Sequence, residues 1–357
     1  MNQKTMKALV CDSPGNYALR EVPVPQIVEP TDVIGRVTLA AICTSDIHYV
    51  RGELATATYP RTMGHEFCVE IIETGAEVKN HKVGDRCVVK PGASCGECFM
   101  CQLGIRSGCV RGGIFGSIGH LEGCHAEYVR IPFADSTGQL IPIPQGLSDE
   151  DVIMLPDMLA TAWFGIVNAG LQEGQTVSVV GVGPVGLSTC LLAKRLFKAK
   201  TVIAVDLIQE RVDLAVASGV ADFGINAATE NVGSRVQELV GPLGVDVTIE
   251  TAGEEDALET SANITRPSGV LSTVSIFPKS MMPTPMNTMM VKNISFKYGI
   301  QQCAGLPEML AAIRAGSIDT GFMMTHKRPL NDIEEGYRVF GSKADGCIKW
   351  LVTPWQN

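Results

Sequence analysis

Residues Thr176–Asp206 read TVSVVGVGPVGLSTCLLAKRLFKAKTVIAVD, and the architecture of the chain is most clearly visible in this segment. A β-branched run leads into the glycine turn GVGPVG, which is followed by an apolar-periodic segment and a second β-branched run ending in an acid. This order predicts a strand, a tight turn, a helix and a second strand. Such units build doubly wound parallel sheets, so the segment indicates an α/β fold of that kind.

Each glycine of the turn has a physical function in binding a dinucleotide. Gly181 permits the tight turn, Gly183 lets the backbone approach a pyrophosphate, and Gly186 lets the helix pack close to the strand. The helix N-terminus offers unpaired N–H groups and the positive end of a dipole to the phosphates. Glycine-rich turns also occur in ordinary α/β domains, but here the strand, the helix and the acid all have the required spacing. We therefore expect a dinucleotide site.

The acid at the end of this segment indicates which dinucleotide binds. Asp206 lies 20 residues after Gly186, where its carboxylate can accept hydrogen bonds from both hydroxyls of an adenosine ribose. The same charge repels a 2′-phosphate, so NAD is favoured over NADP. Arg211, five residues further on, is expected beside the adenosine.

The composition is that of a globular protein of 357 residues, 45% of them hydrophobic and 19% charged, which is long enough for two domains. A net charge of −9 without a basic block argues against nucleic acid or an anionic membrane as a partner. No apolar run reaches membrane-spanning length, and the first residues, MNQKTMKALV, lack a signal-peptide hydrophobic segment. We therefore expect a cytoplasmic protein with no membrane partner.

The patterns of apolar runs, prolines and glycines predict two domains, with the end of the chain returning to the first domain. Residues 1–157 alternate short apolar runs with prolines and glycines, which predicts a β-rich, partly open barrel. Residues 158–298 alternate apolar strands with helical segments, as in a parallel sheet buried on both faces. Residues 299–357 are too few for a separate domain and are expected to rejoin the first one. The strand candidates of the parallel sheet are 176–181, 201–206, 222–226, 245–250, 269–276 and 293–299.

Four of the twelve cysteines form a tight cluster with the spacing C-x2-C-x2-C-x7-C. In a cytosolic chain of this size, such a cluster favours metal binding over disulfides, although free thiols and disulfides remain alternatives. Four thiolates this close can surround one tetrahedral zinc with no open position, which is a structural site. The expected ligands are Cys95, Cys98, Cys101 and Cys109.

Cys43, His65, Glu66 and Asp157 are candidates for a second metal site. A catalytic zinc needs three protein ligands and one open position, and a thiolate, an imidazole and a carboxylate would satisfy it. From residue chemistry alone, purely structural roles for these residues remain open. A lone histidine is often a satisfied structural residue, and a lone cysteine often a small core residue.

The sequence resembles the zinc-dependent medium-chain alcohol dehydrogenase family over essentially its whole length. The resemblance is carried by CTSDIH at Cys43–His48, by Gly64–Glu66, by the four-cysteine run 95–109 and by GVGPVG at Gly181–Gly186. It implies a GroES-like catalytic domain at 1–157 and a Rossmann domain. It also implies two zinc ions per chain: a structural one and a catalytic one.

The resemblance extends to one branch of that family. Leu155–Met158, read with CTSDIH, resembles the bacterial secondary alcohol dehydrogenases, in which an aspartate replaces the second cysteine ligand. It implies Cys43, His65 and Asp157 as the catalytic zinc ligands. That branch often prefers NADP and lacks the four-cysteine lobe. This chain has both Asp206 and the lobe, so it combines two patterns.

The resemblance also implies roles around the zinc. Ser45 takes the alcohol proton, His48 passes it to solvent through the cofactor ribose, and Glu66 lies just behind the metal. Thr161 and Val185 match positions that contact the nicotinamide. The alternatives are a turn hydroxyl for Ser45 and a surface position for His48. Four further histidines have no partner that the sequence can name: His81, His120, His125 and His326.

The expected function is hydride transfer between NAD(H) and a small secondary alcohol or ketone, small diols included. A polyol or L-threonine dehydrogenase is the alternative within the same chemistry. A non-catalytic NAD-binding sensor or structural protein is the alternative of another class, although it would not need an open metal site. The resemblance implies a homodimer or a homotetramer.

Overall fold

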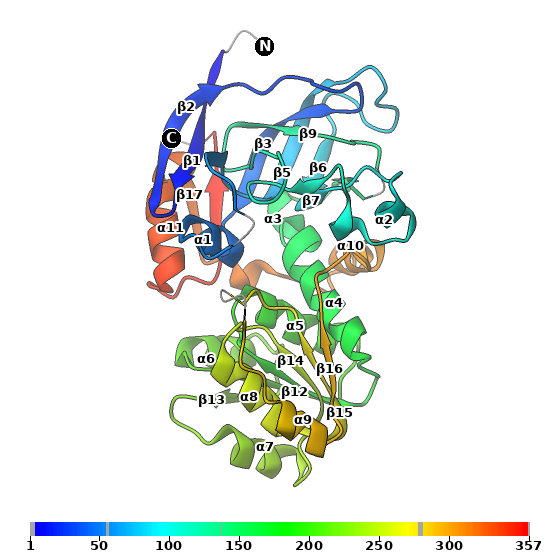
Figure 1. The fold of residues 1–357 in the computed structure, drawn as a ribbon, viewed down its shortest axis with the longest axis vertical. Helices are drawn as coiled ribbons and strands as arrows, with labels where there is room; N and C mark the ends of the chain where they lie inside the picture. Colours follow the sequence, from blue (N-terminus) through cyan, green and yellow to red (C-terminus); the bar gives the residue numbers. More distant parts are fainter. Residues whose placement is uncertain (1–3, 55–56, 137, 278–280, 356–357) are drawn as a thin grey trace. The chain divides into compact units, whose positions relative to one another are not determined.

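The structure is a computed structural model that describes residues 4–54, 57–136, 138–277 and 281–355. The chain divides into two compact units, shown in Figure 1. Unit 1 combines Met1–Asp157 with Met323–Asn357, and unit 2 is Met158–Phe322. Unit 1 is rich in strands and unit 2 is an α/β unit built on a parallel sheet, so the expected fold class is confirmed.

Unit 1 is organised around a sheet with the strand order β10-β6-β5-β3-β18-β17, and β9 also pairs with β3. A second sheet has the order β2-β1-β4, and β7 pairs with β8. The strands are β1 (Thr5–Ser13), β2 (Asn16–Pro23), β3 (Val33–Ala41), β4 (Arg61–Thr62), β5 (Glu66–Thr74), β6 (Arg86–Val89), β7 (Gly92–Ala93), β8 (Gly113–Ile114), β9 (Tyr128–Ile131), β10 (Leu140–Pro142), β17 (His326–Pro329) and β18 (Trp350–Thr353).

The central strands of unit 1 form where β-branched and aromatic residues alternate with small ones, a pattern that fits a pleated, buried surface. β3 and β5 pair antiparallel over most of their length, with Val37 opposite Val69. Phe67 of β5 packs edge-on against Phe115, and both are fully buried. Unit 1 carries the short helices α1 (Thr44–Val50), α2 (Phe99–Gln102), α3 (Asp149–Val152) and α11 (Ile333–Ser342).

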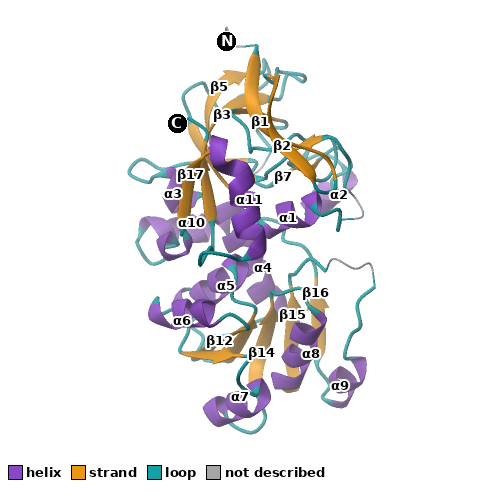
Figure 2. Ribbon diagram, turned by 90° about the vertical axis from the view of Figure 1, so that its left-hand side faces the viewer, coloured by secondary structure: helices purple, strands orange, loops and turns teal. Residues whose placement is uncertain are grey.

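Unit 2 holds a six-stranded parallel sheet with the order β13-β12-β11-β14-β15-β16. Figure 2 shows strands of this sheet side by side with α8 lying across them. The strands are β11 (Thr176–Val180), β12 (Thr201–Asp206), β13 (Phe223–Asn226), β14 (Val245–Glu250), β15 (Thr265–Thr273) and β16 (Ser295–Tyr298). The helices are α4 (Ala160–Ala169), α5 (Pro184–Arg195), α6 (Gln209–Ala217), α7 (Val232–Val240), α8 (Glu255–Ile264), α9 (Met286–Val291) and α10 (Leu306–Arg314).

The return of the chain to unit 1 falls at Met323, not at the expected residue 299. The segment between them stays with unit 2 because two glycines in it pack on aromatic rings of α4. A Cβ added at Gly299 would lie 2.9 Å from the ring of Phe164, and one at Gly305 would lie 2.3 Å from the ring of Trp163. Helix α10 follows directly from this contact.

One helical stretch, Asp149–Ala169, has the length and apolar composition of a membrane span. Of its 18-residue apolar window, 67% is buried inside the protein, as expected for a core segment.

Candidate metal and cofactor sites

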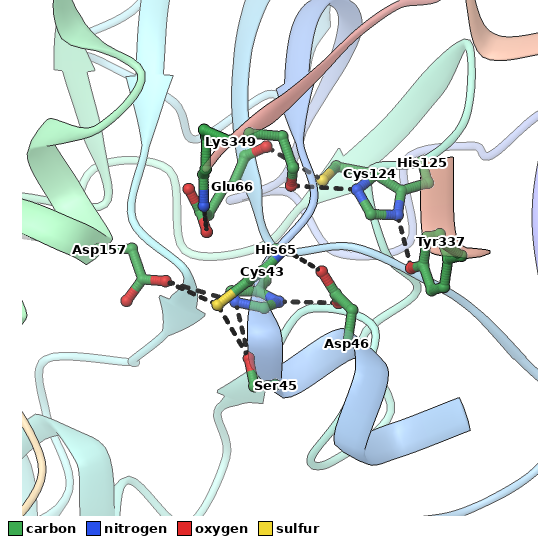
Figure 3. Close-up of polar contacts among 11 residues, drawn as sticks. Cys43, Ser45, Asp46, His65, Glu66, Cys124, His125, Asp157, Tyr337 and Lys349 are labelled. Carbon is green, nitrogen blue, oxygen red and sulfur yellow. Dashed lines mark hydrogen bonds and ion pairs between the residues drawn. The ribbon is translucent and has the colours of Figure 1, made fainter. Parts of the chain in front are cut away.

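The proposed catalytic ligands come from three separate places in unit 1. Cys43 follows β3 and caps the N-terminus of α1, His65 precedes β5, and Asp157 ends the first segment of the unit. Figure 3 shows their side chains turned toward one another. One ligand atom from each of these residues and from Glu66 lies within 4.8 Å of the others.

The distances within this cluster suit zinc. Asp157 Oδ2 lies 3.4 Å from His65 Nε2 and 3.8 Å from Cys43 Sγ. Tetrahedral zinc, with bonds of about 2.0–2.3 Å to nitrogen, oxygen and sulfur, places neighbouring ligand atoms roughly 3.3–3.7 Å apart, close to the distances found here. A thiolate, an imidazole and a carboxylate therefore fit one ion and leave its fourth position open.

Asp46 orients the histidine of this cluster. Its Oδ1 accepts a hydrogen bond from His65 Nδ1 at 3.1 Å, which leaves Nε2 facing the other ligands. Its Oδ2 accepts the Cys43 N–H at 2.9 Å, so one carboxylate fixes two ligands. Burial alone would raise the pKa of Asp46, but His65 and the Cys43 N–H outweigh it and lower the pKa, which keeps the carboxylate charged.

Ser45 and His48 both lie on α1. The Ser45 hydroxyl is 3.3 Å from Cys43 Sγ and 3.2 Å from His65 Nε2, in contact with two candidate ligands. His48 Nδ1 lies 2.5 Å from Glu53 Oε2, a pairing that the sequence analysis did not anticipate. The sequence signal for this pair is the spacing of five residues between His48 and Glu53, with Gly52 offering a turn between them.

Glu66 is paired with a residue that sequence reasoning missed. Its Oε1 lies 2.5 Å from Lys349 Nζ, and neither side chain is exposed to solvent. Burial raises the pKa of Glu66 to about 7 against the opposing effect of Lys349. Burial works to lower the pKa of Lys349, but the neighbouring carboxylate outweighs it and raises the pKa, so the lysine keeps its charge. The Glu66 Oε2 is buried with no hydrogen-bond partner among the described residues, which leaves it available to an ion.

His125, for which the sequence offered no partner, is fully buried behind the ligands. Its Nδ1 lies 2.9 Å from the Tyr337 hydroxyl and its Nε2 lies 3.2 Å from the Ala41 carbonyl oxygen. The ring also covers Gly64, where a Cβ would lie 2.6 Å from it. Burial lowers the pKa of His125, so the ring is neutral near pH 7. No local pattern marks these contacts, because the partners are distant in sequence.

The four-cysteine lobe forms a second cluster. None of the twelve cysteines, all within the described residues, forms a disulfide, and the sulfur atoms of Cys95, Cys98, Cys101 and Cys109 lie within 4.8 Å of one another. Cys109 Sγ is 3.6 Å from Cys95 Sγ and 3.9 Å from Cys98 Sγ. Four sulfurs about 2.3 Å from one zinc would be roughly 3.8 Å apart, so the lobe fits a closed site.

Backbone N–H groups lower the pKa of two of the four cysteines, Cys95 and Cys98, whereas burial raises the pKa of Cys101 to about 12. The Cys98 N–H points at Cys95 Sγ, and the Cys95 N–H points at Cys109 Sγ. Burial opposes the charged form of Cys95, but N–H donors from Glu97 and Cys98, together with Arg111, lower its pKa to about 6. A thiol that ionises below neutral pH is a ready metal ligand.

The glycine turn of unit 2 is as tight as its sequence predicts. Gly181 has φ of +88°, in the left-handed region, and a Cβ there would lie 2.7 Å from Ala252. A Cβ at Gly186 would lie 1.9 Å from the Gly181 carbonyl oxygen. Gly183 caps the N-terminus of α5, and Arg211 Nη1 lies 3.5 Å from where its Cβ would be. A basic group therefore stands beside the turn expected to receive the phosphates.

Asp206 stands at the end of β12 with its carboxylate turned to the same turn. Oδ2 accepts the Val182 N–H at 2.7 Å, and Oδ1 accepts the Ile208 N–H at 3.0 Å. Each oxygen keeps lone-pair capacity for another donor. Thr161 and Val185 lie half-buried on α4 and α5, two helices that pack against each other.

Two segments of the chain match known families. Residues 29–145 match the alcohol dehydrogenase GroES-like domain, and residues 184–314 match the zinc-binding dehydrogenase family. The zinc-type alcohol dehydrogenase B of Aspergillus flavus is 35% identical over 349 residues, which cover 95% of this chain and 80% of the relative. The chain therefore belongs to the zinc-dependent medium-chain alcohol dehydrogenase family, an oxidoreductase family, as the resemblance indicated.

Solved structures with this fold cover nearly the whole chain. A protein described as a short chain alcohol dehydrogenase, from E. coli CFT073 and complexed with NADH, is 26% identical, with a TM-score of 0.87 and coverage of 98% of this chain and 100% of that one. A zinc-binding dehydrogenase of Sinorhizobium meliloti 1021 bound to NADP is 29% identical, with a TM-score of 0.87 and coverage of 99% and 100%. The 2R,3R-butanediol dehydrogenase of Bacillus subtilis is 27% identical, with a TM-score of 0.84 and coverage of 98% and 99%.

Proposed function

We propose that this protein is an NAD-dependent dehydrogenase that interconverts a small secondary alcohol and its ketone, with small diols among its substrates. The observation that carries the proposal is the cluster of Cys43, His65 and Asp157, whose ligand atoms lie within 4.8 Å of one another. Three ligands with an open fourth position serve catalysis, and a sensor or structural protein has no need of them. The similarity to a butanediol dehydrogenase supports the diol as a substrate class.

The residues around the ligands divide the chemistry among them. Zinc held there would polarise the alcohol oxygen and lower the pKa of its hydroxyl, so that the alkoxide forms near neutral pH. Ser45, in contact with Cys43 and His65, accepts the alcohol proton, and His48 passes that proton toward solvent. Glu66 stays behind the ligands, with its charge balanced by its buried lysine partner.

Unit 2 supplies the cofactor site. Gly181, Gly183 and Gly186 shape the pyrophosphate turn, and Arg211 lies beside it. Asp206 accepts the ribose hydroxyls and excludes a 2′-phosphate, which favours NAD. The matched family positions Thr161 and Val185 contact the nicotinamide. The free thiols fit a reducing compartment, so we assign the protein to the cytoplasm.

Metal analysis of the purified protein tests the two zinc sites without relying on activity. Wild type is expected to carry two zinc ions per chain. Cys43→Ala and Asp157→Ala are each expected to lose one of them, and Cys98→Ala the other. A wild-type content of one zinc, or a variant of either set that keeps both zinc ions, would mean that one site is misassigned.

A substrate panel followed by NADH absorbance tests the reaction. It compares 2-propanol, 2,3-butanediol, sorbitol, L-threonine and primary alcohols with NAD as oxidant. Secondary alcohols and the diol are expected to turn over fastest. Preference for sorbitol or threonine would assign the polyol or amino-acid alternative, and no turnover by zinc-loaded protein with any of them would favour a non-catalytic NAD-binding protein.

A second copy of the chain is the partner that we propose for unit 2. Strand β16 ends the sheet, and its four residues, Ser295–Tyr298, are all exposed. The neighbouring helix α9 exposes Met286, Met290 and Val291. An edge strand with unpaired backbone groups and apolar side chains invites pairing, and a two-fold axis lets the same edge serve both copies.

A further inference from the structure

Helix α1 ends in a turn that folds the chain back over its last residues. Gly52 has φ of +73°, in the left-handed region, and a Cβ there would lie 2.7 Å from Pro14. The N–H of Gly52 bonds to the Tyr49 carbonyl at 2.9 Å, and the N–H of Glu53 bonds to the His48 carbonyl at 2.9 Å. These two bonds form a Schellman motif, which fixes the backbone of Glu53 beside that of His48.

The two side chains meet as a result. Glu53 Oε2 lies 2.5 Å from His48 Nδ1, and the side chains are 32% and 18% exposed. An ionised carboxylate only accepts hydrogen bonds, so Nδ1 carries the ring proton. The Nε2 of the neutral ring is then left as the proton acceptor. The pair thus offers a basic nitrogen and remains in reach of water.

The presence of a carboxylate at position 53 is not explained by a gain in the stability of helix α1. The C-terminus of a helix is the negative end of its dipole, so a carboxylate placed there gains nothing from the helix itself. A partly exposed contact between a basic and an acidic side chain adds little to stability. The turn would form with any residue at position 53, because the bond that fixes it comes from the backbone N–H.

We propose that Glu53 is a positioning residue of the proton relay, which holds His48 in one tautomer and stabilises the imidazolium when the alcohol proton arrives. The proposal rests on the proposed function. Oxidation of a secondary alcohol by NAD⁺ gives a ketone, NADH and one proton, and that proton has to leave the site in each turnover. His48 takes it on Nε2 while Nδ1–H stays bonded to the Glu53 carboxylate, and the imidazolium then releases one proton to water.

The experiment measures single-turnover NADH formation and proton release, the latter with a pH indicator in a stopped-flow instrument, using zinc-loaded enzyme and the best alcohol of the panel. Glu53→Gln keeps a hydrogen-bond acceptor and removes the charge. It is expected to slow both rates roughly 10-fold, which is less than the 10²–10⁴ of a general base itself. Glu53→Asp is expected to return to within about 3-fold of wild type. Zinc content and NAD affinity are expected to stay unchanged.

Glu70→Gln is the matched control. Glu70 has a similar exposure of 37% and also has a basic partner, Arg36, at 2.6 Å. Its substitution is expected to leave both rates at the wild-type value. A general loss of a surface carboxylate charge would instead slow Glu70→Gln as much as Glu53→Gln.

A double-variant cycle separates a relay function from a structural one. If Glu53 acts through the imidazole, adding Glu53→Gln to His48→Gln changes neither rate further. Additive losses, or wild-type proton release by Glu53→Gln alone, overturn the proposal. Wild-type enzyme that oxidises no alcohol defeats the proposed function instead, so the two failures are distinguishable.

Discussion

Lys349 and Glu66 form an ion pair with no solvent-exposed side-chain surface, directly behind the candidate ligands. Two charges removed from water stabilise a protein only while each neutralises the other. Within the described part of the chain, Lys349 holds one oxygen of the Glu66 carboxylate, and Oε2, the other oxygen, has no hydrogen-bond partner. Lys349 thus lowers the pKa of Glu66 against the larger effect of burial, which leaves that pKa raised to about 7.

Removal of the lysine alone is predicted to destabilise the protein strongly. Lys349→Met is expected to lower the free energy of unfolding by about 3–5 kcal/mol, because it leaves a buried carboxylate without its counter-charge. Urea denaturation of zinc-loaded protein measures the change. The double variant Lys349→Met with Glu66→Gln is expected to recover most of the loss. A double variant as unstable as Lys349→Met would show that the lysine acts by packing alone.

Substitution of Asp206 is predicted to change the preference for NAD over NADP. Asp206→Gly is expected to weaken NAD binding roughly 10-fold or more through lost hydrogen bonds to a charged acceptor, and to improve the use of NADP. The ratio of kcat/KM for NAD to that for NADP measures both effects. Because Asp206 also accepts the Val182 and Ile208 N–H groups, Asp206→Asn serves as the control that keeps an acceptor and removes the repulsion. An unchanged ratio in both variants would refute the ribose role.

At the scale of elements, one aspartate ties together the starts of three neighbouring strands. Asp246 of β14 accepts the backbone N–H and the hydroxyl of Thr176 in β11, both at 2.8 Å. Its other oxygen accepts Arg266 Nε of β15, also at 2.8 Å. Burial opposes the charged form, but these donors outweigh it and lower the pKa of Asp246.

The direction of that shift predicts a pH dependence of stability. A carboxylate whose pKa is lowered by folding stabilises the folded state above its unfolded pKa of about 3.9, and the stabilisation is lost as pH falls through the folded pKa. Asp246→Asn is therefore expected to lose about 1 kcal/mol at pH 7 and progressively less below about pH 4. Urea unfolding of both proteins between pH 7 and pH 3 measures the difference, and a constant gap across that range would contradict the assignment.

Sequence patterns predicted the strands of unit 2 well where apolar runs were continuous. The run at 176–181 became β11, Thr176–Val180, and the run at 245–250 became β14. β15 starts at Thr265, four residues before its predicted start. The pattern missed these residues because Arg266–Gly269 has no β-branched alternation. Ser268 there has φ of +55°, and the pairing with β14 shifts register nearby. Local periodicity cannot reveal an irregular strand that only its neighbour stabilises.

The family resemblance, and no spacing rule, singled out Cys43, His65 and Asp157, whose ligand atoms lie within 4.8 Å of one another. It did not point to the residues that support them. Lys349 lies 283 positions from Glu66, so no spacing rule connects them. His125 meets Tyr337 across 212 positions in the same way. Such partners are set by the fold of unit 1, which a single sequence does not display.

At the scale of the whole molecule, the exposed edge of unit 2 predicts the state of the protein in solution. Light scattering is expected to show a dimer or a tetramer, and Phe296→Glu on β16 is expected to shift it toward monomer, because a buried charge opposes pairing. Val83→Glu, at an exposed apolar position of unit 1, is the control and is expected to change nothing. A monomeric wild type, or equal effects of the two variants, would remove β16 as the contact.

The discontinuity of unit 1 has a consequence for how the protein is made. Cys43, His65 and Asp157 emerge from the ribosome first, all of unit 2 follows, and Lys349 emerges only after unit 2. Glu66 remains without its counter-charge for the whole of that interval, and β18, which joins β3, has not yet been synthesised. Unit 2 is thus able to finish folding during translation, whereas the ligand-bearing unit is completed only after β18 has been synthesised.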